Sequence, residues 1–539
     1  MVTHDVVNQT PPLADFNPFL ADAALQEAVG REGAGHVRRG LVERGCEIGS
    51  ATMIALADAA NRNPPVLALF DATGHRRDVV EFHPAYHELM SYLARHGAAA
   101  GPWAAPSPGA HVARAAFYYL YAQVEDGTLC PTTMTYASVP ALREDPALAA
   151  TWLPRIARCE YDPRFIPAQD KRGVTLGMGM TEKQGGSDVR ANTTRAEPSG
   201  GRAYRIVGHK WFFSAPMCDA FLILAQAPGG LSCFLLPRFT PDGDVNAIRI
   251  QRLKDKLGDR SNASSEVEFE GAHAELVGDE GRGIATILAM GTYCRLDCVL
   301  GTAGLMRAAV SHAMHHARHR RAFGKRLVEQ PLMRNVLADL ALESEAAMAL
   351  AMRLARAFDE AGESAASFRR IVTPAAKFWV CKRGPALAAE AMEVLGGNGY
   401  VEEGPLARLY RQMPLNSIWE GSGNVMCLDV LRAARRESGC LDAIRDELAL
   451  AEGGSAILDH FADATLNALR HATDDSQARG STQRLALALQ ASLLVRFAPS
   501  FVADAFCATR LAADAFGGGA FGASAIGESA RIVERAWPQ

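Results

Sequence analysis

The 539-residue sequence lacks several features that would place it in a specialised class of protein. No run of about 18 uncharged apolar residues is present. The first residues, MVTHDVVNQTPPLADFNPF, have no basic segment followed by an apolar one, so we predict neither a membrane association nor a secretory signal. The 11 cysteines form no CxxC pair and have no spacing typical of a zinc site. We therefore expect reduced thiols in a cytoplasmic protein without a metal site.

Neither sign of charge dominates the composition. The chain has 56 Lys and Arg against 60 Asp and Glu, a net charge of −4, which argues against a whole surface built to bind nucleic acid or anionic membrane. Apolar residues make up 48% and charged residues 22%, the mix of an ordinary folded protein. At roughly 100 to 200 residues per domain, this length predicts three or four domains.

The spacing of apolar residues divides the chain into four predicted domains. Spacings of three and four residues predict helices through 1–171, and short apolar runs bounded by Gly, Pro, Asp or Ser predict a β-domain over 172–279. Helical spacing returns over 280–439, where four long segments suit a four-helix bundle. Residues 440–539 predict an appended helical domain. The expected fold is mostly α with a central antiparallel β-domain.

One segment between two predicted strands, GMGMTEKQGGSDVRANTTRA at 177–196, is rich in glycine and hydroxyl side chains. Small residues let a backbone approach a ligand closely, and hydroxyl and N–H groups supply hydrogen-bond partners. The segment has neither the βαβ context of a Rossmann site nor a P-loop pattern. It predicts a turn that holds a ligand, with a glycine-rich hairpin that binds nothing as the alternative.

Two further clusters extend this prediction. GHKWFFSAP at 208–216 follows at a spacing that lets its strand lie beside the first, so both strands would present side chains to one flat ligand. The segment at 390–424 ends in WEGSGN at the start of a helix, where N–H groups without partners form an anion or pyrophosphate site. Simple helix caps at Ser422 and Asn424 are the alternative.

In this order the clusters resemble the flavin-dependent acyl-CoA dehydrogenases, over about residues 60–437. The family's T-E-x-x-x-G-S-D turn is TEKQGGSD at 181–188, and its G-x-K-x-W-I-T strand resembles GHKWFFS at 208–214. RRAFG at 320–324 matches R-x-x-F-G, and LGGNGY at 395–400 with WEGSGN at 419–424 is similar to the L-G-G-x-G-Y through Y-E-G-T segment. The resemblance implies an N-terminal helical domain, a β-barrel-like middle domain and a C-terminal four-helix bundle, followed here by an extra C-terminal helical domain.

The resemblance also implies an FAD site and a homotetramer in which some side chains reach the FAD of a neighbouring subunit. The residues that it assigns to the cofactor are Met178, Met180, Thr181, Gly186, Ser187, Phe212, Phe213, Ser214, Arg320, Phe323, Gly396, Gly397, Ser422 and Asn424.

The catalytic base is a separate question, because dehydrogenation of an acyl thioester requires a carboxylate to remove the α-proton. Glu420 matches the family's catalytic glutamate, and burial beside Trp419 would raise its pKa into a useful range. A glutamate favoured only by the helix dipole is the alternative. Some members place the base where this chain has Cys294, which is not a carboxylate. Arg295 and Arg432 match positions near the cofactor or ligand, although surface salt bridges would also explain them.

Within the family the chain is most similar to the AidB-type branch, which is linked to the response to DNA alkylation. The similarity includes REGAGH at 31–36 and LKDKLGDRSNASSEVEF at 253–269. It implies binding of duplex DNA, protection or repair of alkylated DNA, and weak dehydrogenation of acyl-CoA. The alternatives are a metabolic short- or branched-chain acyl-CoA dehydrogenase that passes electrons to an electron-transfer flavoprotein, and a DNA-binding module that keeps FAD for structure.

The appended domain does not have the charge expected for DNA binding. Residues 440–539 contain 8 Arg and no Lys against 12 Asp and Glu, which leaves a net charge of −4. A basic stretch at 307–334 is the better candidate for phosphate contacts, with Arg307, Arg318, Arg320, Arg321, Lys325, Arg326 and Arg334 against Glu329. The same stretch holds His312, His315, His316 and His319, without the carboxylate or cysteine that would favour a metal site.

Overall fold

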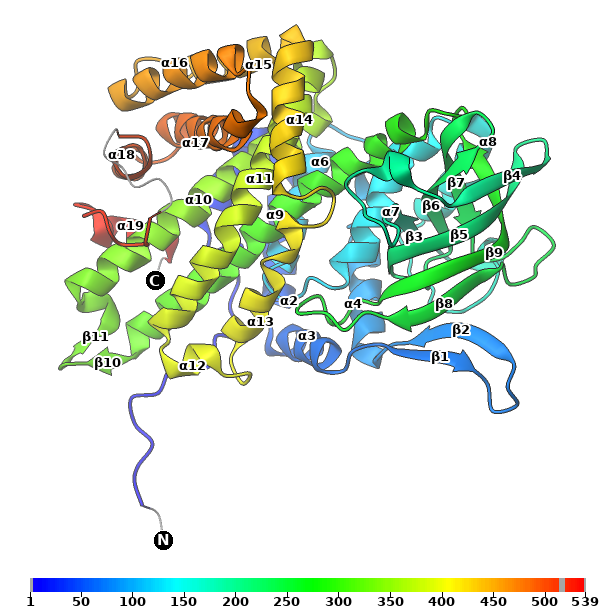
Figure 1. The fold of residues 1–539 in the computed structure, drawn as a ribbon. Helices are drawn as coiled ribbons and strands as arrows, with labels where there is room; N and C mark the ends of the chain where they lie inside the picture. Colours follow the sequence, from blue (N-terminus) through cyan, green and yellow to red (C-terminus); the bar gives the residue numbers. More distant parts are fainter. Residues whose placement is uncertain (1–2, 513–518, 538–539) are drawn as a thin grey trace. The chain divides into compact units, whose positions relative to one another are not determined.

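The computed structural model of the protein describes residues 3–512 and 519–537. The chain forms two units that alternate along the sequence (Figure 1). We call the first the bundle unit, built from Met1–Met53, His111–Val124 and Arg295–Gln539, and the second the sheet unit, built from Ile54–Ala110 and Glu125–Cys294. Each unit contains residues from more than one of the four predicted domains, so the units do not test the predicted domain boundaries.

The strands of the sheet unit confirm a barrel-like middle domain. Five strands pair in the order β6-β4-β5-β9-β7, and β7 pairs again with β6, which closes the ring. β3 adds to the ring at β6, and β8 adds at β9. The strands are β3 (Leu176–Gly179), β4 (Arg195–Gly200), β5 (Ala203–Ser214), β6 (Ala220–Ala227), β7 (Gly230–Pro237), β8 (Ile248–Leu253) and β9 (Ser264–Val277).

The prediction of a purely antiparallel sheet is wrong at β6. β3 runs parallel to β6, with Leu176 opposite Ala220, and β4 pairs with β6 in parallel at Arg195. A parallel pair needs a crossover of a dozen or more residues, which the long segment between β3 and β6 supplies. The first six residues of β6 are all buried. A strand covered on both faces has a continuous apolar run instead of an alternating pattern, as parallel strands commonly do.

Two glycines of β3 let aromatic rings press against its backbone. A Cβ at Gly177 would lie 2.5 Å from the Phe221 ring, and a Cβ at Gly179 would lie 2.5 Å from the Phe213 ring. The two rings pack together with centroids 4.4 Å apart. These glycines of the 177–196 segment therefore serve the core of the sheet unit.

Helices complete the sheet unit, as predicted for the region before residue 171. They are α3 (Ala51–Arg62, which begins in the bundle unit), α4 (Pro84–Arg95), α5 (Gly101–Ala104), α7 (Leu129–Leu142) and α8 (Pro146–Ile156). The sequence analysis missed a hairpin of β1 (Val66–Phe70) and β2 (Arg76–Glu81) in this region. The buried carboxylate of Asp78 ties the hairpin to β8, because it accepts a hydrogen bond from the Ile250 amide at 2.9 Å.

Long helices confirm the four-helix bundle of the bundle unit. They are α9 (Gly283–His319, whose first turns belong to the sheet unit), α10 (Pro331–Asp359), α11 (Glu363–Val394) and α14 (Gly423–Arg436), with the short α12 (Gly397–Tyr400) and α13 (Pro405–Gln412) before α14. By length and composition α9 could cross a bilayer, but 61% of its apolar window is buried inside the protein. We therefore interpret α9 as a core helix. Helices α1 (Ala23–Val29), α2 (Arg38–Ile48) and α6 (Ala110–Tyr121) precede the bundle in the sequence.

The appended segment is helical, as predicted, and it is joined to the bundle by buried charges. Its helices are α15 (Ser438–Ala449), α16 (Ala456–His471), α17 (Ala478–Phe497), α18 (Ser500–Arg510) and α19 (Ser529–Ala536), and α17 lies against α10, α11 and α14 (Figure 1). Arg510 at the end of α18 pairs with Asp339 and Glu343 of α10. Arg383 of α11 also pairs with Glu343, at 3.2 Å. All four side chains are buried.

Candidate functional site

The predicted ligand-holding turn is organised around a buried ion pair that the sequence analysis did not predict. Glu182 Oε1 lies 2.8 Å from Lys210 Nζ, and neither side chain is exposed. Lys210 also donates a hydrogen bond to the Leu224 carbonyl at 2.8 Å. Burial by itself would raise the pKa of Glu182, but the Lys210 ammonium and amides of the turn lower this pKa to about 2. The carboxylate therefore stays charged and fixes the turn from the inside.

The polar residues after the turn use hydrogen bonds on the turn itself. Thr193 donates both its amide and its hydroxyl to Glu182 Oε2, at 2.7 and 3.1 Å, and the Thr194 amide donates to Oε1 at 3.2 Å. Asn192 Nδ2 donates to the Met180 carbonyl at 3.0 Å. Residues 183–188 at the tip are exposed, and they include the predicted residues Gly186 and Ser187. Thr181 packs on Gly186, where a Cβ would lie 2.3 Å from its hydroxyl oxygen.

Strand β5 separates the predicted cofactor residues between its two faces. Phe212 is 53% exposed, whereas Phe213 is fully buried against Phe221. The side chain of Phe213 therefore belongs to the core, and alternation along a strand is the reason. Ser214 is half-buried, with its hydroxyl 3.4 Å from that of Ser264. In β3, Met178 is buried, and Met180 just after it is half-buried.

Glu420 lies on a strained stretch of backbone in the bundle unit. Its φ of 60° is in the left-handed region, which costs a residue with a side chain about 1–3 kcal/mol and commonly marks a functional site. Two cationic side chains hold this conformation. Arg295 Nε donates to the Glu420 carbonyl at 3.0 Å, and Lys377 Nζ donates to the Gly421 carbonyl at 2.7 Å. Lys377 is buried, and the sequence analysis did not single it out.

Burial raises the pKa of the half-buried Glu420 carboxyl above that of an ordinary glutamate, while the charges of Arg295 and Lys377 act in the opposite direction. This balance is what a general base needs, because a base with a pKa nearer the operating pH takes a proton more effectively. The predicted alternative base position, Cys294, is a buried thiol, as expected from its sequence. Arg432 lies on the surface, 57% exposed, 3.5 Å from Asp429.

The wall beside the base is fixed by hydrogen bonds. Trp419 Nε1 donates to Asn416 Oδ1 at 2.8 Å, and Asn416 Nδ2 donates to the Thr302 hydroxyl at 3.1 Å. Thr302 in turn donates to the Cys298 carbonyl at 2.8 Å. Asn416 is buried, so its amide can fix the indole without competition from water.

The start of α14 keeps the features of an anion site. The Ser422 side chain forms no capping bond, and the first intrahelical bond runs from the Met426 amide to the Ser422 carbonyl. The amides of Gly423 and Asn424 point along the helix axis without an intrahelical partner. Asn424 Oδ1 accepts a hydrogen bond from Arg479 Nη1 of α17 at 2.8 Å, so the appended segment reaches this helix start.

The predicted residues Arg320 and Phe323 belong to a hairpin of β10 (Arg321–Ala322) and β11 (Lys325–Arg326) and the residue just before it. Phe323, at the tip, has a φ of 51° and is 97% exposed. Asn8 binds the hairpin twice: its Nδ2 donates to the Arg321 carbonyl at 2.9 Å, and its Oδ1 accepts from the Arg321 amide at 2.8 Å. Arg320 Nη1 donates to the Asn8 carbonyl at 2.6 Å.

In the other predicted pair, Gly396 lies between α11 and α12, and Gly397 is the first residue of α12. Gly396 has a φ of 61°, and a Cβ at either glycine would meet no atom within 4 Å in the described parts of the chain. The neighbouring Tyr400 is 81% exposed. This end of the bundle therefore leaves backbone and an aromatic ring open to solvent.

The basic stretch at 307–334 is less available for phosphate than its sequence suggests. Arg307 is buried and lies 3.3 Å from Asp22, and Arg318 pairs with Glu534 at 3.0 Å. The histidines hold the N-terminal segment: His315 Nε2 lies 2.8 Å from the Pro11 carbonyl, and His316 Nδ1 lies 2.9 Å from the Thr10 hydroxyl. Across residues 3–512 and 519–537 no cluster of His, Cys, Asp or Glu could hold a metal ion. The exposed cations of this stretch are Arg321, Lys325 and Arg326.

Comparison with known proteins gives a consistent result. Residues 8–163 match the model of the adaptive response protein AidB N-terminal domain, 177–272 the acyl-CoA dehydrogenase middle domain, and 281–434 the acyl-CoA dehydrogenase C-terminal domain. A putative acyl-CoA dehydrogenase, AidB of Escherichia coli, is 50% identical over 94% of both chains.

Solved structures agree. The crystal structure of Caenorhabditis elegans ACDH-11 in complex with C11-CoA superposes with a TM-score of 0.86, at 27% identity, over 95% of this chain and 94% of that one. An acyl-CoA dehydrogenase from Bacillus anthracis complexed with FAD shares the fold, with a TM-score of 0.64 at 17% identity over 79% of this chain and 80% of that chain. The three family models and the 50% identity over 94% of both chains show that the chain belongs to the acyl-CoA dehydrogenase family, in its AidB-type branch.

Proposed function

We propose that the protein is an FAD-dependent oxidoreductase of the acyl-CoA dehydrogenase type, which forms a double bond between the α and β carbons of an acyl thioester. The observation that carries the proposal is Glu420, a half-buried carboxyl with a raised pKa on a backbone that Arg295 and Lys377 hold in place.

Each unit contains groups that are suited to one part of FAD. In the bundle unit, the amides of Gly423 and Asn424 lie with Lys382 and Arg479, and neither cation forms an ion pair with any residue that the structure describes. Such a donor set suits a pyrophosphate. In the sheet unit, the exposed ring of Phe212 suits an aromatic ring system.

The chain's own residues perform the proton transfer. Glu420 in its carboxylate form accepts the α-proton, and its raised pKa stabilises the acid that results. Trp419, fixed through Asn416, forms a rigid wall beside the base. FAD, when bound, supplies the hydride acceptor.

Anaerobic addition of acyl-CoA to the FAD-loaded protein tests this proposal. We expect the flavin absorbance near 450 nm to bleach, and Glu420→Gln to prevent bleaching while FAD remains bound. Bleaching that is unchanged in Glu420→Gln would contradict the assignment of the base.

We propose a second function, binding of duplex DNA during protection from or repair of alkylation, from the resemblance to the AidB-type branch and the match of residues 8–163 to the adaptive response protein AidB N-terminal domain. The exposed cations Arg321, Lys325 and Arg326 are its best structural support, whereas the acidic segment 440–539 speaks against DNA contact there. Fluorescence anisotropy with a labelled duplex should show affinity that falls steeply with salt and weakens in Arg321→Gln/Lys325→Gln. Absence of binding even at low salt would exclude this function.

The metabolic alternative would require fast electron transfer to an electron-transfer flavoprotein. Turnover of about 1 to 10³ per second with a short or branched acyl-CoA would favour it. We also propose a cytoplasmic location and a homotetramer. Phe323 supports the homotetramer, because it exposes nearly its whole ring on a hairpin tip, where a second subunit would cover it. Analytical ultracentrifugation measures the oligomeric state directly.

A further inference from the structure

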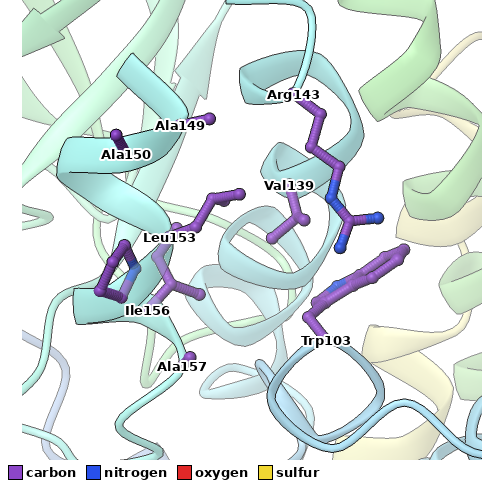
Figure 2. A pocket seen from close by; sticks show the side chains of 9 residues that line it. Trp103, Val139, Arg143, Ala149, Ala150, Leu153, Ile156 and Ala157 are labelled. Atoms are coloured by element: carbon purple, nitrogen blue, oxygen red, sulfur yellow. The ribbon is translucent and has the colours of Figure 1, made fainter. Parts of the chain in front are cut away.

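A cavity of about 410 Å³ lies among the helices of the sheet unit, and none of the residues predicted for FAD or catalysis lines it. Its volume is within the range of about 300–1,000 Å³ that is usual for small-molecule sites. Figure 2 shows Leu153 and Ile156 of α8 and Val139 of α7 reaching into it, with Trp103 of α5 and Arg143 on one side. The walls are apolar, and Arg143 is the one charged side chain among the lining residues.

Trp103 is a rigid part of this wall. Pro140 has no N–H, so the Tyr136 carbonyl, four residues earlier in α7, cannot receive its usual helical hydrogen bond. Trp103 Nε1 donates to this carbonyl at 2.9 Å, and the two rings lie 5.5 Å apart. The indole is also 5.5 Å from the ring of Tyr293. A wall that is fixed before binding reduces the entropy that a ligand must lose.

Arg143 forms no ion pair within the described parts of the chain. Its guanidinium carbon lies 4.9 Å from the centre of the Trp103 ring. Figure 2 shows the two side chains next to each other. The two acidic residues that follow it in sequence are occupied elsewhere, because Glu144 accepts from the Thr286 hydroxyl at 2.9 Å and Asp145 lies 2.7 Å from Arg202. A planar guanidinium beside an indole at the edge of an apolar cavity is suited to bind a carboxylate through two parallel hydrogen bonds.

A second polar group lies in the cavity wall. Pro154 in α8 also lacks an N–H, so the Ala150 carbonyl has no helical partner, and both residues line the cavity. Unlike the Tyr136 carbonyl, it receives no side-chain hydrogen bond in the described structure. Ala150 and Pro154 are exposed, so the carbonyl is open to solvent, and the polar group of the lining that suits an anion is the Arg143 guanidinium.

We propose that this cavity is a binding site for an aliphatic carboxylate, separate from the acyl thioester site at Glu420. The carboxylate pairs with Arg143, and the alkyl chain lies against Leu153 and Ile156. Charge complementarity selects the free acid, because an alcohol of the same length lacks the anion and a thioester has lost it. The proposal does not depend on FAD or on dehydrogenase activity.

Isothermal titration of the full-length protein with octanoate tests the proposal, with 1-octanol and octanoyl-CoA as comparison ligands. We expect octanoate to bind the native protein and Arg143→Gln to lower the affinity for octanoate about 10-fold or more. The affinity of the native protein for octanol should be no higher than the affinity of Arg143→Gln for octanoate. Arg155→Gln, a matched change on α8 outside the lining, should leave the affinity unchanged.

Ala149→Phe provides an independent test, because it reduces the volume of the cavity while Arg143 is retained, and it should also abolish octanoate binding. Circular dichroism melts confirm that each variant is folded. Octanoate affinity that is equal in native protein, Arg143→Gln and Ala149→Phe would overturn the proposal. Equal affinities of the native protein for octanol and octanoate would also overturn it. So would displacement of octanoate by octanoyl-CoA to the same extent in the native protein and in Arg143→Gln.

Discussion

Lys210 Nζ and Glu182 Oε1 lie 2.8 Å apart with no solvent exposure on either side chain. Removal of one partner leaves the other as an unpaired buried charge, which typically costs 3–5 kcal/mol. We therefore expect Lys210→Met to lower the free energy of unfolding by about 3–5 kcal/mol in urea denaturation. Lys183→Met is the matched control, because its 3.9 Å pair with Glu268 is exposed and should contribute less than about 1 kcal/mol. Equal losses in both variants would contradict a structural role for the buried pair.

Glu420 predicts the pH dependence of flavin bleaching. Burial raises its pKa, so the rate of bleaching should increase with pH, with a midpoint above the pKa of an ordinary glutamate. Below this midpoint the protonated carboxyl cannot accept the α-proton. Glu420→Gln should lower the rate about 10²- to 10⁴-fold, the usual contribution of a general base. Stopped-flow absorbance across pH measures both effects. A rate independent of pH in the native protein would argue against Glu420 as the base.

Lys377 predicts a shift of that profile. Its charge lowers the pKa of Glu420, so Lys377→Met should move the midpoint to higher pH, while Lys377→Arg should largely preserve it. A residue that only supports the fold would change the rate without moving the midpoint. The stopped-flow pH profiles of the two variants distinguish these cases.

Arg479 should affect how firmly FAD is bound. It donates to Asn424 Oδ1 at 2.8 Å and lies 5.2 Å from the centre of the Phe378 ring, so it fixes a residue at the start of α14. Arg479→Gln should lower the ratio of 450 to 280 nm absorbance in purified protein. Arg470→Gln, an exposed change in the same appended segment, should leave the ratio unchanged. The same FAD content in all three proteins would exclude a role for Arg479.

Asn8 should influence the hairpin that carries Phe323. Asn8→Ala removes both hydrogen bonds from the Asn8 amide to the Arg321 backbone. If Phe323 contacts a neighbouring subunit, this variant should dissociate at higher protein concentration in analytical ultracentrifugation and retain less FAD. Thr3→Ala is the control, since the Thr3 hydroxyl bonds its neighbour His4. Identical subunit dissociation constants for the native protein and Asn8→Ala would show that the hydrogen bonds of Asn8 to Arg321 are not needed for assembly.

The order of helical and strand segments could be predicted because apolar spacing reports the face that each element buries. Helical spacing over 283–320 and 331–363 predicted α9 and α10 closely, since long helices repeat the signal over many turns. The direction of β6 could not be predicted from spacing, because a strand buried on both faces has no alternation to read. Its unbroken apolar run was the available signal.

Candidate site residues could be predicted where they lie in a sequence motif, but not where their role depends on a tertiary contact. Glu420 follows from WEGSGN, but Lys377 lies more than 40 residues earlier, and nothing in its local sequence indicates that it reaches the Gly421 carbonyl. Asn192, Thr193 and Thr194 have the residue types of a ligand site, yet their hydrogen bonds are used on Glu182 and the Met180 carbonyl. Hydrogen-bonding capacity is visible in a sequence, whereas the direction in which it is used is not.

Arg510 makes α10 depend on the appended helices for its charge balance. Without residues 440–539, Asp339 would lose the Arg510 guanidinium and the Gly522 amide, and Glu343 would keep Arg383 as its cationic partner in the described structure. The side of α10 that α17, α18 and α19 cover would also become exposed. A chain truncated after the bundle should therefore be less stable than the full-length protein.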